Sequence, residues 1–163
     1  MYHALGRDRQ LASLQLRFLL PRDLPAVCEI EERSFPEFER WGPNDFKRFL
    51  ERQELGAAVI IDDQARVLGY LAFRVYRCGR QLLRLVVHPA WRRRGIGRAS
   101  LSRFIIDQST PGQGVAAVVH ERRVGVQLFF RACGWRWVRT LKGKFAPDDG
   151  YRFELGTAEN TNG

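Results

Sequence analysis

Residues 92–98 read RRRGIGR, a run of arginines interrupted by two glycines. An apolar run typical of a strand precedes them, and apolar residues at helical spacing follow. A glycine turn that opens a helix leaves backbone N–H groups unpaired at the positive end of the helix dipole. Such groups bind phosphate or pyrophosphate. The pattern predicts an anion cradle, with a solvated arginine-rich turn as the alternative.

Two familiar phosphate-binding motifs do not fit this segment. The P-loop requires a lysine after its last glycine, and the only lysines are Lys47, Lys142 and Lys144. The dinucleotide motif GxGxxG requires a glycine where Ser100 stands. The cradle therefore follows neither pattern.

The elements that would position the cradle alternate in type along the chain. We predict strands at about 14–20, 57–62, 67–76, 81–89, 114–120, 135–140 and 151–155. We predict helices after Asp23, over about 46–50, from Gly97 to about 108, and over about 124–133. The order βααβββαβαββ indicates an α/β fold with a mixed sheet.

The length of 163 residues and the composition limit the kind of protein further. One domain over 13–156 is expected, with a flexible arm at 1–12 and a disordered polar tail at 157–163. No apolar run is long enough to span a membrane and no secretory signal is evident, so we expect a cytoplasmic protein. Three widely spaced cysteines without a CxxC pair predict neither disulfides nor a metal site. The net charge of +9 suits an anionic partner.

The RxxGxG string at 92–97 and the string VQLFFRACGW at 126–135, with ERSFP at 32–36, resemble the GNAT N-acetyltransferases. The likeness is greatest to the ribosomal-protein alanine acetyltransferases and related N-terminal acetyltransferases. It covers nearly the whole folded unit and implies the GNAT-like acyl-CoA N-acyltransferase fold. It also implies acetyl-CoA as co-substrate and direct transfer, in a ternary complex, to a primary amine, with a protein N-terminus as the favoured acceptor.

The resemblance implies site residues as well. The strand that contacts the pantetheine arm and the acetyl carbonyl matches Leu85, Val86 and Val87. The residues that match the pyrophosphate cradle are Arg92, Arg93, Arg94, Gly95, Ile96, Gly97, Arg98 and Ala99, and two further cofactor contacts match Arg123 and Phe130. The region that shapes the acceptor pocket contains Phe35 and Trp41.

The catalytic positions depart from the family pattern. The glutamate base is Val118 here, the asparagine that opens the next helix is Arg123, and the tyrosine acid is Phe130. Because strand side chains alternate, His120 shares a face with Val118 and is the predicted substitute base. Tyr151 is the predicted substitute acid. The alternatives are a polar strand end for the histidine and a packing aromatic for the tyrosine.

Other functions stay open. The acceptor could be a small-molecule amine, a polyamine or a lysine side chain. The losses at Val118 and Phe130 would suit a non-catalytic acyl-CoA-binding module. A basic domain that docks on RNA or the ribosome is a third class, although no nucleic-acid-binding motif is recognisable.

Overall fold

Seven strands form one mixed sheet in the computed structural model, which describes residues 11–108 and 113–155. Their order across the sheet is β1-β2-β3-β4-β5-β7-β6, and only the β4–β5 pair is parallel. The strands are β1 (Gln15–Phe18), β2 (Leu55–Ile61), β3 (Val67–Tyr76), β4 (Gly79–Val87), β5 (Gly114–His120), β6 (Trp135–Phe145) and β7 (Asp148–Leu155). The predicted α/β class with a mixed sheet is confirmed.

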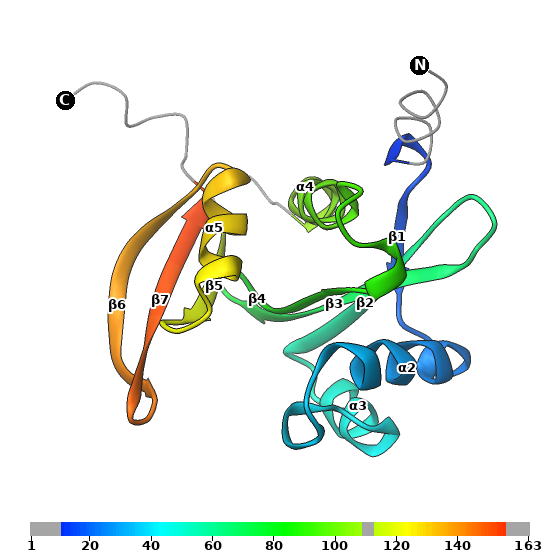
Figure 1. Cartoon of the computed structure of the whole chain (residues 1–163), viewed down its shortest axis with the longest axis horizontal. Helices are drawn as coiled ribbons and strands as arrows, with labels where there is room; N and C mark the ends of the chain where they lie inside the picture. Colours follow the sequence, from blue (N-terminus) through cyan, green and yellow to red (C-terminus); the bar gives the residue numbers. More distant parts are fainter. Residues whose placement is uncertain (1–10, 109–112, 156–163) are drawn as a thin grey trace.

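In the described part of the chain, four helices cover the two faces of this sheet: α2 (Leu24–Ser34), α3 (Pro43–Leu50), α4 (Ile96–Gln108) and α5 (Val124–Ala132). Helices α2 and α3 lie on one side of the central strands and α4 on the other, with α5 beside α4 (Figure 1). Short 3-10 turns occupy Pro21–Asp23, Glu37–Glu39 and Pro89–Trp91. The predicted order of strands and helices is confirmed.

The predicted ends of three strands were wrong. β1 is shorter than 14–20, because only residues 15–18 pair with β2. β6 and β7 extend to Phe145 and Asp148, so the hairpin turn is shorter than the predicted loop around 147–150. The end of β6 reads TLKGKF and is mostly exposed, so it lacks the apolar alternation that marks a half-buried strand.

Alternation along β2 and β3 explains why helices pack on both faces. Ala57, Val59 and Ile61 pack with Val27 and Ile30 of α2 and Phe46 of α3. Ala58 packs on the opposite face, in a cluster with Leu101 and Phe104 of α4 and Phe130 of α5. Because both faces are covered, β2 and β3 are almost continuously buried.

A β-bulge in β4 separates the two halves of the sheet. Ala72 pairs with Arg84 while Phe73 pairs with Leu82, so Leu83 is an extra residue on β4. The parallel pairing with β5 runs only from Gly79 to Leu82, opposite 114–117, and stops where the bulge begins. A bulge bends the strand that contains it. Beyond Leu82, β4 and β5 therefore diverge and leave a wedge between them.

Most of both predicted terminal segments lies outside the described residues. Of the predicted arm at 1–12, the structure describes Leu11 and Ala12. Leu11 packs against a cluster that includes Leu14, Ile60 and Ile96. The tail at 157–163 is not among the described residues. In the described part of the chain, no helix has both the length and the apolarity that a membrane span requires.

Candidate active site

The wedge between β4 and β5 opens into a cavity of about 600 Å³. Its walls come from both diverging strands, from α5 and from the segment between α2 and α3. The predicted cofactor contacts Leu85, Val86, Val87, Gly97, Arg123 and Phe130 line it, as do Phe35, Val118 and His120. Apolar side chains dominate the walls, and Glu39, Arg84, His120 and Arg123 are their ionisable residues. A cavity of this size and lining is typical of a site for an organic ligand.

One end of the cavity meets the start of α4. The carbonyl of Gly95 accepts the first helical bond, from Ala99 N–H at 3.0 Å. Among the described residues, no backbone carbonyl accepts from the N–H groups of residues 93–98. Arg93 and Gly95 have positive φ angles of 63° and 83°, so the chain turns sharply at both. The loop and helix end therefore have the geometry of the predicted anion cradle.

The cradle's arginine side chains brace the loop. Arg92 donates to the carbonyl oxygen of Val87 at 2.8 Å and to Ser34 Oγ at 2.7 Å. Arg98 donates to the carbonyl oxygen of Ala132, at the end of α5. The guanidinium of Arg94 lies 4.8 Å from the ring centroid of Trp91. These contacts hold Arg92 and Arg98 against the protein, whereas the exposed side chain of Arg93 has no hydrogen-bond partner among the described residues. The cradle can therefore offer guanidinium donors as well as its backbone N–H groups.

At the other end, a buried carboxylate organises the cavity floor. Glu31 is fully buried and accepts hydrogen bonds from Tyr70 Oη and from Trp41 N–H, the latter at 2.8 Å. Arg84 Nη1 donates to both of its carboxylate oxygens, at 2.8 and 2.6 Å. Every polar atom of the buried carboxylate is thus paired, which offsets much of the cost of removing it from water. Burial and the adjacent Glu31 carboxylate raise the pKa of Tyr70, so this hydroxyl stays protonated as a donor.

Arg84 joins this floor to the segment between α2 and α3. Its guanidinium lies 4.3 Å from the ring centroid of Trp41 and 4.7 Å from that of Phe35. Its Nη2 donates to the carbonyl oxygen of Glu39 at 2.7 Å. The carboxylate of Glu39 in turn forms an ion pair with Arg123 at the start of α5. A chain of polar contacts therefore crosses the cavity from β4 to α5.

The two predicted catalytic residues occupy different places. His120 lines the cavity, and its Nδ1 accepts from Arg122 N–H at 3.1 Å while its Nε2 lies 3.3 Å from Asp148 Oδ2. This pairing puts the proton of a neutral ring on Nε2 and leaves no free lone pair. Tyr151 is not among the cavity-lining residues and packs against Trp137, with ring centroids 6.4 Å apart. Catalysis by these residues stays a prediction.

Sequence reasoning missed Glu31, Glu39 and Arg84. One signal was available for Glu31, since a charged residue four positions after Val27 lies on the apolar face of α2. No local pattern marks Arg84 or Glu39, because their partners are 53 and 84 residues away. Within 11–108 and 113–155, no three His, Cys, Asp or Glu side chains gather as a metal-binding group.

Comparisons with known proteins agree with this arrangement. The model of the acetyltransferase (GNAT) family matches residues 24–135. No curated protein sequence matches the chain. An acetyltransferase from Thermus thermophilus is 25% identical, with a TM-score of 0.71, over 90% of this chain and 99% of that one.

Two solved structures with known acceptors share the fold. The Escherichia coli ribosomal-protein-S18-alanine N-acetyltransferase is 18% identical, with a TM-score of 0.69, over 91% of this chain and 97% of that one. The spermidine/spermine N-acetyltransferase of Vibrio cholerae is 16% identical, with a TM-score of 0.65, over 89% and 93%. One acts on a protein and the other on polyamines, so the shared fold leaves the acceptor open.

Proposed function

The chain belongs to the acetyltransferase (GNAT) family, and on that premise we propose that it transfers an acetyl group from acetyl-CoA to the amino terminus of a protein. The GNAT family uses acetyl-CoA as acetyl donor. The observation that carries the proposal is the wedge between β4 and β5, which leads from an apolar cavity to unpaired backbone N–H groups at the start of α4.

The residues present fit acetyl-CoA. The N–H groups of residues 93–98 would hold the pyrophosphate, because a helix N-terminus attracts anions. The inner edge of β4 beyond Leu82 is not paired with β5, so its backbone groups are available to the amides of a pantetheine arm. Bound there, acetyl-CoA supplies a thioester that an amine can attack.

The charge of the cavity favours an amino terminus over a polyamine. Glu39 is the one carboxylate among the described lining residues, and Arg84 and Arg123 line the same cavity. Arg84 is already paired with Glu31 and Arg123 with Glu39, so the described lining offers one exchangeable carboxylate, which suits the single charge of an amino terminus better than the several charges of a polyamine. An α-amino group, with an ordinary pKa of ~7.7–8.0, is also partly uncharged near neutral pH.

An α-amino acceptor has little need of a catalytic base, which agrees with the residues at the two catalytic positions. Val118 and Phe130 both line the cavity, and neither can exchange a proton. An uncharged α-amino group needs no base to become nucleophilic. A thiolate, with a reference pKa of ~8.5 for its thiol, can leave without prior protonation. We propose His120 and Tyr151 only as secondary aids, since His120 would first have to release Arg122 N–H.

Release of free thiol from acetyl-CoA tests the proposal. The purified protein is assayed with tetrapeptides that begin with Ala, Ser, Gly or Met and have free amino termini. The same peptides with blocked amino termini, and spermidine, are the comparison substrates. We expect turnover with at least one free peptide, none with its blocked form, and slower turnover with spermidine.

Each other result points to a different function. A higher melting temperature with acetyl-CoA but no thiol release from any amine would identify a non-catalytic acyl-CoA-binding module, because ligand binding alone stabilises the folded state. Faster turnover of spermidine than of every peptide would replace the N-terminal acceptor with a polyamine. If acetyl-CoA neither raises the melting temperature nor is turned over, that result would contradict the acetyl-CoA site itself.

A further inference from the structure

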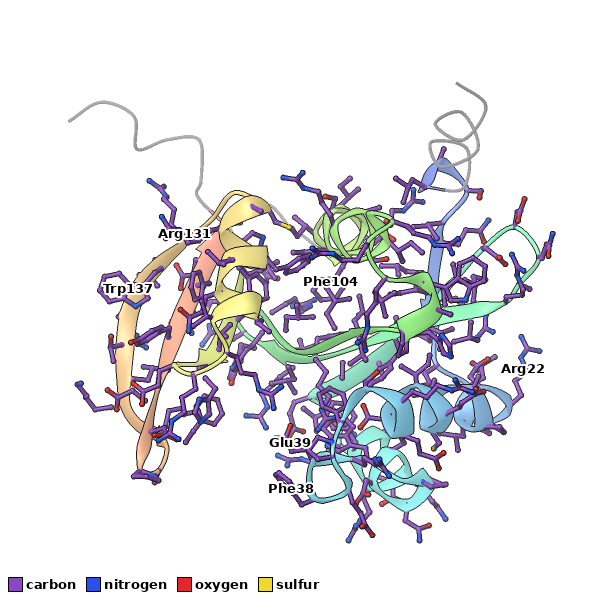
Figure 2. All side chains as sticks on the ribbon, in the orientation of Figure 1. Arg22, Phe38, Glu39, Phe104, Arg131 and Trp137 are labelled. Carbon is purple, nitrogen blue, oxygen red and sulfur yellow. The ribbon has the colours of Figure 1, made fainter. Side chains whose placement is uncertain are left out.

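Glu39 holds an unusual position for an acidic residue in this strongly basic chain. It lies in the 3-10 turn Glu37–Glu39, between α2 and α3, and its side chain is 31% exposed. Figure 2 shows it on the side of this turn that is nearer to β4, with Phe38 further out. Among the described residues that line the cavity, its carboxylate is the only anionic group.

Contacts from both sides of the wedge fix residue 39. The carbonyl oxygen of Glu39 accepts from Arg84 on β4 at 2.7 Å, so its main chain is tied to the strand just before Leu85. Its carboxylate pairs with Arg123, next to α5. The carboxylate therefore lies on the side of the cavity formed by α2 and α3, away from the cradle at α4. An acceptor that reaches a thioester in the wedge from that side passes Glu39.

The ion-pair partner of Glu39, Arg123, is exchangeable. Arg123 is 47% exposed, and ion pairs this open to solvent contribute little to stability. An incoming ammonium group offers the same charge and more compact donors. Replacement of one cation by another keeps the carboxylate paired throughout, and the displaced guanidinium of Arg123 is exposed enough to be solvated by water.

We propose that Glu39 binds the ammonium group of the acceptor, which takes the place of Arg123 on its carboxylate. This inference rests on the proposed function and names the residue that recognises its acceptor. A single carboxylate selects acceptors with one positive charge at the reacting end. It also supplies the anionic contact that Val118 cannot provide.

The test compares Glu39→Gln with the matched variant Glu37→Gln. Glu37 lies in the same 3-10 turn and is exposed, and it is not among the residues that line the cavity. Both variants and the wild type are assayed with the best free peptide from about pH 6.5 to about pH 9.5, across the ordinary pKa of an α-amino group. Calorimetric titration with acetyl-CoA shows whether each variant is folded and binds its co-substrate.

We expect Glu39→Gln to lower kcat/KM for the peptide about 10- to 100-fold at the acid end, as for loss of a hydrogen bond between charged groups. The loss should appear as a higher KM with unchanged acetyl-CoA affinity. It should shrink at the alkaline end, where the acceptor is uncharged and gains nothing from a carboxylate. Glu37→Gln should match the wild type at every pH.

Two outcomes would overturn the inference while the proposed function stands. One is a Glu39→Gln variant with wild-type kinetics, and the other is a loss that is the same at every pH, which indicates a structural role. If the wild type itself releases no thiol with any free peptide, the proposed function fails first and the inference falls with it.

Discussion

The two ends of the cavity are built from different parts of the polypeptide. At the α4 end the backbone N–H groups of one continuous segment, 93–98, have no carbonyl partner among the described residues. At the opposite end the polar groups are side chains of Glu31, Glu39, Arg84 and Arg123, which come from four separate parts of the chain. A backbone site is fixed by local conformation, whereas a side-chain site depends on the packing of distant elements. The two ends should therefore respond differently to substitution.

Arg84→Met should have the largest effect, because it leaves the buried Glu31 carboxylate without its cation. Breaking one side of a buried ion pair costs about 3–5 kcal/mol. Since Tyr70 and Trp41 still donate to Glu31, we expect a loss of about 3 kcal/mol in the free energy of unfolding. Urea denaturation at neutral pH measures it.

Two controls identify the cause of that loss. Arg122→Met removes a guanidinium that is 73% exposed, and should change stability by less than about 1 kcal/mol. The double variant Glu31→Gln with Arg84→Met has no buried charge at this position, and it should recover a large part of the lost stability. A double variant as unstable as Arg84→Met alone would show that lost packing, and not the unpaired carboxylate, causes the effect.

Gly95→Ala should have an intermediate effect on stability. It tests the difference between the two ends of the cavity, because Gly95 belongs only to the end formed by backbone N–H groups. Gly95 and Gly134 have nearly equal φ angles, 83° and 84°, so alanine at either position should cost about 1–2 kcal/mol. Only Gly95 belongs to the cradle. We expect Gly95→Ala to weaken acetyl-CoA binding about tenfold by calorimetry, and Gly134→Ala to leave it unchanged. Equal affinities would contradict a cradle formed by this loop.

The smallest expected effect is on the stability of the protein at acidic pH, and it depends on Asp23. Arg17 pairs with both carboxylate oxygens of Asp23 at 2.7 and 2.8 Å, and Leu20 N–H also donates to it. These bonds hold the pKa of Asp23 below its ordinary value, although burial opposes them. The folded state therefore binds fewer protons than the unfolded state. The stability that Asp23 contributes is complete above its unfolded pKa, ~3.9, and is lost as the pH falls through the lowered value.

Asp23→Asn should consequently flatten the decline of unfolding free energy below about pH 4. Asp23 precedes α2, which contains Glu31, so protonation of Asp23 at low pH should destabilise the side-chain end of the cavity. The backbone amides of the cradle do not titrate, so the other end should be unaffected. Urea denaturation over a pH series compares the slopes of the two proteins. A variant whose slope equals that of the wild type would remove Asp23 from the acid response.

The same contrast explains how much could be predicted from the sequence. The cradle was predictable because glycines at 95 and 97 between a strand and a helix restrict the local backbone. The nearly continuous apolar runs of β2 and β3, separated by turn residues, made the core strands predictable as well. Arg84 was not, since its role depends on a bulge at Leu83 that turns it toward α2. The full length of β6 was also missed, because an exposed edge strand lacks a buried face.

The early end of the β4–β5 pairing has a consequence for self-association. Unpaired strand edges are where folded proteins add foreign strands and aggregate. The wedge gives the sheet two inner edges, on β4 beyond Leu82 and on β5 beyond Ala117, and the proposed acetyl-CoA site requires the β4 edge to stay unpaired. These edges face one another across the cavity, so a strand of a second molecule could pair with either only by entering the wedge. The two outer edges are protected by other means: β1 pairs over only four residues, and exposed charges mark β6 at Arg136, Arg139, Lys142 and Lys144.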